Sequence, residues 1–201
     1  MQPRIVFVVG NSLHDIDLPR LPGKPTNPGC NNLTMTHRWK PSVTVAAVME
    51  RDGRYLLIEE HTPEGLRLNN PAGHLEQGES LVQACAREAL EETAHTFTPG
   101  YLVGVYLARF QRPGVTDPTE QDITYLRFAF GGSLGQLQTG RHLDTGIERV
   151  LWLSPQEVRA TVAQHRSPMV LQCIEDHLRG QRYPLDVLYA HDSLTGPSGG
   201  D

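Results

Sequence analysis

Short runs of apolar residues recur through the middle of the chain, rich in valine, isoleucine and aromatic side chains and bounded by polar turn residues. Runs of this length and composition predict β-strands. Arg51-Asp52-Gly53 separates the first two runs and favours a tight hairpin between them. The five predicted strands are Val43–Met49, Tyr55–Glu60, Tyr101–Phe110, Ile123–Phe130 and Ile147–Leu153.

Three segments have the pattern and the end signals of helices. The first covers residues 80–93, with Ser80 as its predicted N-cap. Ser154-Pro155-Gln156-Glu157 is a capping box with proline at the first helical position, and it predicts a helix to about His165. A third helix begins at Ser167-Pro168 and ends at Gly180. The side of the first helix that we expect to be buried carries Val82, Ala86, Ala89, Leu90 and Thr93.

The order of these elements predicts an α/β fold. Strands dominate the middle, one helix is inserted early and two follow at the end, so we expect a mixed sheet with helices on both faces. The predicted domain covers residues 39–183. Residues 1–38 read as an irregular N-terminal extension and residues 184–201 as a C-terminal tail, because both are rich in proline, glycine and polar residues. An alternative hypothesis takes Met35 as the natural start of the protein.

The composition narrows the functional class. With 38% hydrophobic and 20% charged residues, the chain is typical of a soluble globular protein. A net charge of −5 argues against general nucleic-acid binding, and no apolar run has the length of a membrane span. Cys30, Cys85 and Cys173 have no metal-ligand spacing, which favours a reducing, cytoplasmic setting. We expect a monomer or homodimer.

Three carboxylates lie close together on the first predicted helix. Glu88, Glu91 and Glu92 are spaced i, i+3, i+4, so they project from one side. Their mutual repulsion costs about 0.2–0.5 kcal/mol for each like-charged pair, and a hard divalent cation would remove this cost. Oxygen ligands alone favour Mg²⁺ or Mn²⁺ over zinc. Taken in isolation, these residues fit an ordinary solvated helix face better than a metal site.

The surrounding sequence changes that interpretation, because it resembles the Nudix box, Gly-x5-Glu-x7-Arg-Glu-U-x-Glu-Glu-x-Gly-U, where U is a bulky apolar residue. Two positions depart from the pattern: Ala94 replaces the last glycine and His95 the last apolar residue. Since that glycine usually ends the helix in a left-handed conformation, alanine should cost about 1 kcal/mol or shift the helix end. The residues in register with the box are Gly73, Glu79, Arg87, Glu88, Glu91 and Glu92.

The resemblance implies a Nudix-type α/β/α sandwich and a hydrolase that acts on phosphoanhydrides. It implies Mg²⁺, with Mn²⁺ as the alternative, held by Glu88, Glu91, Glu92 and the carbonyl group of Gly73, and a metal-activated water as the attacking group. In this interpretation Glu88, Glu91 and Glu92 are also the catalytic residues. For Glu79 and Arg87 we favour a structural ion pair over a direct catalytic role.

Residues outside the box complete the predicted site. His74, Tyr125 and Arg127 are candidates for contact with substrate, and Arg127 is either a paired sheet residue or a phosphate clamp. A further carboxylate often comes from outside the box in this superfamily. The candidates for it are Glu120, Asp122, Asp144 and Glu148, among which we favour Glu148.

Phrases such as Asn70-Pro71-Ala72-Gly73-His74 and Arg166-Ser167-Pro168 resemble the bacterial NudJ phosphatase group. This resemblance implies nucleoside tri- and diphosphates, or the hydroxymethylpyrimidine pyrophosphate of thiamine synthesis, as substrates. One alternative is an ADP-ribose or dinucleoside polyphosphate pyrophosphatase. A second alternative is a non-catalytic ligand-binding regulator, although such domains commonly lose glutamates of the box.

Overall fold

The computed structural model describes residues 6–9, 12–15, 39–111 and 122–194. The chain divides into two compact units, Met1–Arg38 and Trp39–Asp201. In the first unit, β1 (Val6–Val9) and β2 (Ser12–Asp15) form an antiparallel pair. These strands lie in the segment, residues 1–38, whose composition predicts an irregular extension. The alternative start at Met35 lies outside the described residues.

The second unit contains two four-stranded sheets. In one sheet the strand order is β7–β3–β9–β8, and β3 and β9 are parallel, whereas the other neighbours are antiparallel. In the other sheet, β5 lies between β10 and β4 and also pairs with β6. The strands are β3 (Ser42–Val48), β4 (Glu50–Arg51), β5 (Arg54–Thr62), β6 (Gly65–Asn69), β7 (Ala72–His74), β8 (His95–Gln111), β9 (Asp122–Leu137) and β10 (Ile147–Leu153).

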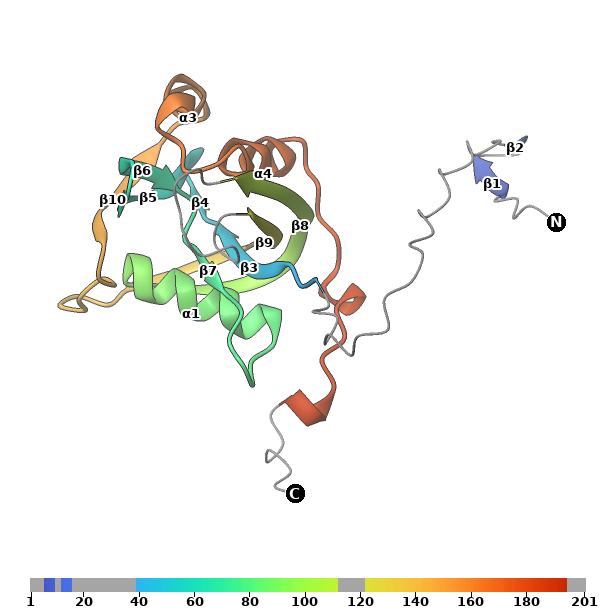
Figure 1. Ribbon diagram of the computed structural model, residues 1–201, viewed down its shortest axis with the longest axis horizontal. Coiled ribbons are helices and arrows are strands. Elements are labelled where there is room, and N and C mark those ends of the chain that lie inside the picture. The colour runs from blue at the N-terminus through green and yellow to red at the C-terminus, as the bar shows by residue number, and fades with distance from the viewer. Residues whose placement is uncertain (1–5, 10–11, 16–38, 112–121, 195–201) are drawn as a thin grey trace, which may run out of the picture. The chain divides into compact units, whose positions relative to one another are not determined.

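Helices cover the sheets on both sides, as the sequence predicts. Helix α1 (Leu81–Thr93) lies on one side, and α3 (Pro155–Ala160) and α4 (Met169–Leu178) lie on the other (Figure 1). Successive residues of β3 point to opposite faces, so this strand contributes to two cores. Val45 packs in the cluster that contains Cys85 of α1, whereas Ala46 packs in the cluster that contains Ile174 of α4. The α/β/α sandwich with a mixed sheet is therefore confirmed.

The predicted hairpin at Arg51-Asp52-Gly53 is only partly correct. The turn forms, with positive φ angles of 54° at Asp52 and 75° at Gly53. However, the strand that pairs with β5 across this turn is the short β4, and β3 belongs to the other sheet. The last five residues of β3 are all buried, which suits an interior strand between β7 and β9 rather than one arm of a hairpin.

Helix α1 begins as predicted, but a different side of it is buried. Ser80 is the N-cap and forms a capping box with Gln83. On the side that was predicted to be buried, Val82, Ala86 and Leu90 are only half-buried. The side chains buried against the sheet include two glutamates, and the full set is Ala84, Cys85, Glu88, Ala89, Glu92 and Thr93. The helix is therefore oriented differently from the prediction: its small residues pack closely, and two of its carboxylates face inward.

The end of α1 resolves the question raised by the missing glycine. The helix stops at Thr93, and Ala94 adopts the left-handed conformation with φ 57° and ψ 9°. Its N–H group donates to the carbonyl oxygen of Leu90 at 2.9 Å. Alanine therefore takes the conformation usually given to glycine, and the helix end does not shift.

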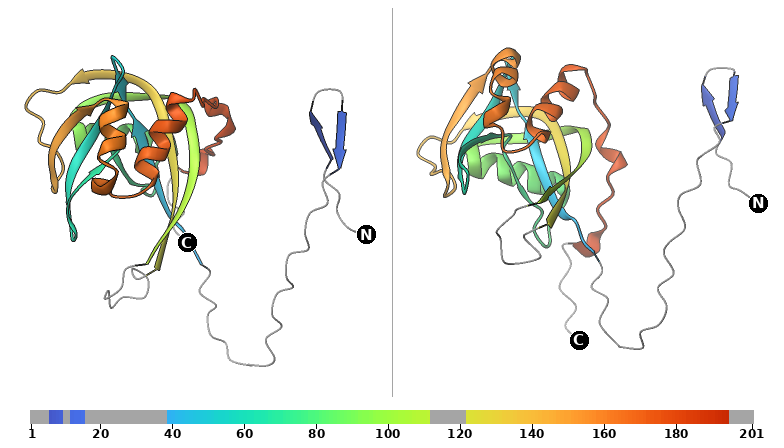
Figure 2. Two further views of the ribbon diagram at one scale, coloured as in Figure 1. Left: turned by 90° about the horizontal axis from the view of Figure 1, so that it is seen from above. Right: turned by 45° about the horizontal axis from the view of Figure 1, so that its top comes forward.

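The C-terminal helices are shorter than predicted. Helix α3 ends at Ala160 and is followed by the 3₁₀ turn η1 (Val162–Gln164), while the tail contains two more such turns, η2 (Leu185–Val187) and η3 (Asp192–Leu194). Strands β8 and β9 are longer than predicted and curve together past the helices (Figure 2). No helix in the described part of the chain combines the length and the apolar surface needed to span a bilayer.

Candidate active site

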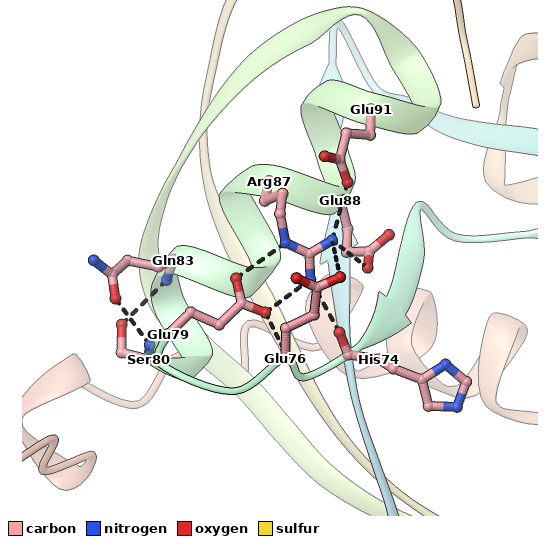
Figure 3. Close-up of polar contacts among 8 residues, drawn as sticks. All are labelled: His74, Glu76, Glu79, Ser80, Gln83, Arg87, Glu88 and Glu91. Carbon is pink, nitrogen blue, oxygen red and sulfur yellow. Dashed lines mark hydrogen bonds and ion pairs between the residues drawn. The ribbon is translucent and has the colours of Figure 1, made fainter. Parts of the chain in front are cut away.

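Arg87 connects the loop before α1 to the acidic side of the helix (Figure 3). Its Nε and Nη2 atoms donate to the two carboxylate oxygens of Glu79 at 3.0 and 2.7 Å. Nη1 donates to Glu88 at 2.8 Å and to Glu91 at 2.9 Å, and Nη2 also donates to the carbonyl oxygen of His74 at 3.0 Å. The loop that carries Glu79 is thereby fixed against three of the box residues.

Burial and charge shift the protonation of these carboxyl groups in opposite directions. The hydrogen bonds from Arg87 lower the pKa of Glu79 below its ordinary value. Burial raises the pKa of Glu88, and Arg87 only partly opposes this effect. Burial also raises the pKa of Glu92 to about 8, although its Oε2 accepts a hydrogen bond from the N–H group of Ala72 at 2.7 Å. The two inward-facing carboxylates thus have less positive charge near them than their burial requires.

Gly73 brings the backbone of β7 against the Glu88 carboxylate. A Cβ atom added to Gly73 would lie 2.1 Å from the carboxyl carbon of Glu88, so this carboxyl group would have to move from its position. Glycine at this position therefore allows the β7 backbone and the Glu88 carboxyl group to approach closely. This is the approach expected if a backbone carbonyl and a carboxylate serve one centre.

The donor set suits a hard divalent cation. Glu88 and Glu92 are buried carboxylates whose raised pKa values show that their negative charge is poorly compensated. Oxygen ligands of this kind fit Mg²⁺ or Mn²⁺. Within the described residues, no three histidine, cysteine or acidic side chains are arranged as a ready metal cage. Arg87 and the Ala72 N–H group hold several of the carboxylate oxygens instead.

A pocket of about 420 Å³ opens beside this acidic region. Among the predicted residues, Gly73, Glu92, His74, Tyr125 and Arg127 all line it, so the structure brings the box and the substrate candidates together. The complete lining is Thr44, Glu60, Thr62, Pro63, Glu64, Arg67, Asn69, Ala72, Gly73, His74, Glu92, Phe110, Gln111, Tyr125, Arg127, Arg166, Ser167 and Met169.

A polar cluster in the lining of this pocket, formed by Glu60, Asn69 and Arg166, was not predicted from the sequence. Glu60 of β5 accepts hydrogen bonds from Nδ2 of Asn69, at 3.0 Å, and from Nη1 of Arg166. The sequence contained part of the evidence for this cluster. Glu60 ends a predicted strand, and Arg166-Ser167 belongs to a phrase that resembles the NudJ phosphatase group. Neither the hairpin prediction nor the phrase indicated that these residues meet.

The four candidates for an external carboxylate are placed differently. Glu148 pairs with His61 at 3.1 Å on the exposed surface, and Asp122 pairs with Arg109. Neither residue lines the pocket. Asp144 lies near the acidic region: its N–H group donates to the carbonyl oxygen of Glu91 at 3.1 Å, and its charge helps to raise the pKa values of Glu88 and Glu92. Glu120 lies outside the described residues.

Comparison with known proteins identifies the family. The model of the NUDIX domain matches residues 38–173, which include the whole acidic helix and every residue that lines the pocket. The chain belongs to the Nudix family. The chain is also similar to the phosphatase NudJ of Escherichia coli K12, which is 35% identical over 150 residues that cover 75% of this chain and 92% of that protein.

Solved structures agree with this assignment. A Nudix hydrolase from Nitrosomonas europaea has 52% sequence identity and a TM-score of 0.68, and the match covers 76% of this chain and 99% of that one. The MutT Nudix hydrolase from Burkholderia pseudomallei, at 20% identity and a TM-score of 0.54, shares the fold. This Nudix protein is therefore a hydrolase acting on phosphorus-containing anhydrides, in a family that generally uses divalent metal ions.

Proposed function

We propose that this Nudix hydrolase cleaves phosphoanhydride bonds in nucleoside tri- and diphosphates, or in a small pyrophosphate monoester such as hydroxymethylpyrimidine pyrophosphate. One observation carries the proposal: Gly73 and Glu92 of the box line the same pocket as Tyr125 and Arg127. A diphosphate at the acidic end of this pocket would leave its organic group among the other lining residues. The similarity to a phosphatase, NudJ, supports the same class of substrate.

Glu88, Glu91, Glu92 and the carbonyl group of Gly73 would hold Mg²⁺, with Mn²⁺ as the alternative. When bound, the metal would neutralise phosphate charge and lower the pKa of a coordinated water. Arg87 positions the glutamates through its hydrogen bonds to Glu88 and Glu91. Glu79 holds Arg87 in place and has no catalytic role in this proposal. Among the four candidates for a carboxylate outside the box, we assign an auxiliary role beside the metal to Asp144.

Positive charge in the pocket would compensate an anionic substrate. Arg67 and Arg166 line it, although the protein as a whole carries a net charge of −5. His74 lies at the same site, and burial and the charge of Arg166 lower its pKa, which favours a neutral imidazole near pH 7. We further propose a cytoplasmic setting, which agrees with two free, buried thiols at Cys85 and Cys173.

The test is an assay of phosphate release from nucleotides and pyrophosphate monoesters with Mg²⁺, Mn²⁺ or a chelator. We expect orthophosphate without added alkaline phosphatase, and a loss of at least about 100-fold in kcat for Glu88→Gln and Glu92→Gln. Glu175→Gln, on α4 and paired with Arg159, is the matched control and should keep full activity. Paired nucleoside monophosphates as products would favour the ADP-ribose or dinucleoside polyphosphate alternative. Unchanged activity of both box variants would end the proposal.

A further inference from the structure

Buried polar atoms without a hydrogen-bond partner are concentrated in residues that line the pocket. Among the described residues, seven buried side-chain nitrogen or oxygen atoms have no partner, and five of them belong to residues that line it. Buried polar groups are normally satisfied, because each unpaired group loses its contacts with water and gains nothing in return. The five atoms are Thr44 Oγ1, Asn69 Oδ1, Arg127 Nε and Nη1, and Ser167 Oγ.

Arg127 is the least compensated of these groups. Its side chain sits in the middle of β9, opposite Thr44 of β3, and only 6% of the residue is exposed. A guanidinium group is always charged and can only donate hydrogen bonds. No carboxylate among the described residues forms an ion pair with it, although Glu60 and Glu92 are near enough to act on it electrostatically. The buried thiol of Cys173, a weak acceptor, is the nearest polar partner, and it leaves Nε and Nη1 of Arg127 without a hydrogen-bond acceptor among the described residues.

Asn69 has the opposite requirement. Its Nδ2 atom donates to Glu60 Oε1 at 3.0 Å, and a carboxylate can only accept, so this contact fixes the orientation of the amide. The remaining Oδ1 atom is a buried acceptor without a donor. A phosphate group would bring further acceptor oxygens and negative charge toward Asn69 and Glu60. The floor of the pocket thus calls for a group that carries a donor as well as an acceptor.

Aromatic side chains form another part of the pocket wall. The rings of Tyr125 and Phe110 lie 5.7 Å apart at their centroids, and the imidazole ring of His74 lies 6.2 Å from that of Tyr125. Such rings offer flat faces and edges to a planar ligand. An aromatic wall beside a floor of donors and acceptors is suited to a planar ring with polar substituents better than to a sugar or an alkyl chain.

We propose that Thr44, Asn69, Arg127 and Ser167 recognise the organic group of the substrate, and that this group is a nitrogen heterocycle with an acceptor and a donor on adjacent positions of its edge. Arg127 donates to the ring acceptor, Asn69 Oδ1 accepts from the ring donor, and the two hydroxyl groups adjust to either. This inference rests on the proposed function in one respect only: the diphosphate lies at the acidic end of the same pocket.

A matched pair of substrates tests the assignment. Cytidine diphosphate and ribose 5-diphosphate share the sugar and the diphosphate, but only the first carries a base. With the full-length protein and Mg²⁺, we expect kcat/KM to be at least about 100-fold higher for cytidine diphosphate, since sites built to hydrogen-bond a group discriminate strongly against its absence. Arg127→Met and Asn69→Leu should each remove most of this preference, whereas Arg149→Met, which removes an exposed arginine of β10, should retain it.

Thermal stability separates recognition from a structural role. Methionine at position 127 keeps most of the side-chain volume and removes an uncompensated buried charge, so its melting temperature should equal or exceed that of the wild type. A structural arginine would instead give a variant with a lower melting temperature and an equal loss of activity on both substrates. An equal loss on both substrates would also be the result if Arg127 bound phosphate, and either result overturns the inference.

Failure of the inference can be told apart from failure of the proposed function by measuring binding. Isothermal titration calorimetry with cytidine monophosphate and ribose 5-phosphate needs no hydrolysis. Base-dependent binding that Arg127→Met abolishes would support recognition even if no phosphoanhydride were cleaved. Hydrolysis with the same kcat/KM for the two diphosphates would leave the proposed function intact and overturn the recognition site.

Discussion

Replacement of Arg87 by methionine would keep an unbranched, flexible stem and remove five hydrogen bonds: two to Glu79 and one each to Glu88, Glu91 and the carbonyl oxygen of His74. The side chains of Arg87 and Glu79 are 24% and 15% exposed, so their contact lies between a surface pair and a buried one. Surface ion pairs contribute about 0–1 kcal/mol, whereas removal of one partner from a buried pair costs about 3–5 kcal/mol. We expect Arg87→Met to lower the free energy of unfolding by about 2–3 kcal/mol.

Urea denaturation of the metal-free protein at pH 7 measures this loss. The matched control is Arg109→Met, because Arg109 also pairs with a carboxylate, Asp122, but both side chains are exposed, at 61% and 41%. For this control we expect a loss below about 1 kcal/mol. A double-mutant cycle with Glu79→Gln isolates the coupling between Arg87 and Glu79 from the other contacts.

The effect of Arg87 should also depend on pH. Because its hydrogen bonds lower the pKa of Glu79 from an ordinary value of 4.5, ionised Glu79 stabilises the folded state. That contribution is fully present above the unfolded pKa and is lost as the pH falls through the lower, folded pKa. The difference between wild type and Arg87→Met should therefore shrink as the pH falls below about 4.5. A loss no larger than that of Arg109→Met, or one that is unchanged between neutral and acid pH, would refute the reasoning.

Three further predictions concern the same helix and its neighbour β7. Since burial raises the pKa of Glu92 from 4.5 to about 8, the metal-free protein should lose stability as the pH rises through this interval, and Glu92→Gln should flatten the slope of unfolding free energy against pH. Gly73→Ala places a Cβ atom within 2.1 Å of the Glu88 carboxyl group, and should reduce kcat by at least about 100-fold in the phosphate-release assay. Ala94→Gly relieves about 1–2 kcal/mol of left-handed strain but loses a buried methyl group, about 0.8 kcal/mol, and adds unfolded-state entropy of about 0.5–1 kcal/mol. Its unfolding free energy should thus stay within about 0.5 kcal/mol of wild type in urea denaturation, and a gain above about 1.5 kcal/mol would contradict this balance.

The elements whose signals are local could be predicted from the sequence. Strand β10 has the predicted bounds, Ile147–Leu153, because a glycine precedes it and the Ser154 capping box follows it. The N-cap at Ser80 depends on contacts three residues away and is likewise confirmed. The pairing of β3 could not be predicted in the same way, since the residues opposite it belong to β7 and β9, which are distant in sequence.

The candidate site also has a part with local sequence signals and a part that depends on long-range contacts. The acidic residues follow one another on a helix, so their spacing alone brings them together. The contact between Arg166 and Glu60 in the lining of the pocket joins residues that are 106 positions apart in the sequence, and no local pattern indicates such a contact. Arg127 could be recognised as unusual within an apolar strand, but only the tertiary structure shows that two of its nitrogen atoms have no partner in the described chain.

The acidic residues and the pocket floor come from separate elements: the former from α1, the latter from β3, β6, β9 and the segment just before α4. Substitutions in the floor can therefore alter ligand preference while the helix that carries the glutamates keeps its caps, its packing and its ion pairs. Mutational drift could retarget such an enzyme toward new metabolites in small steps, without passing through inactive intermediates.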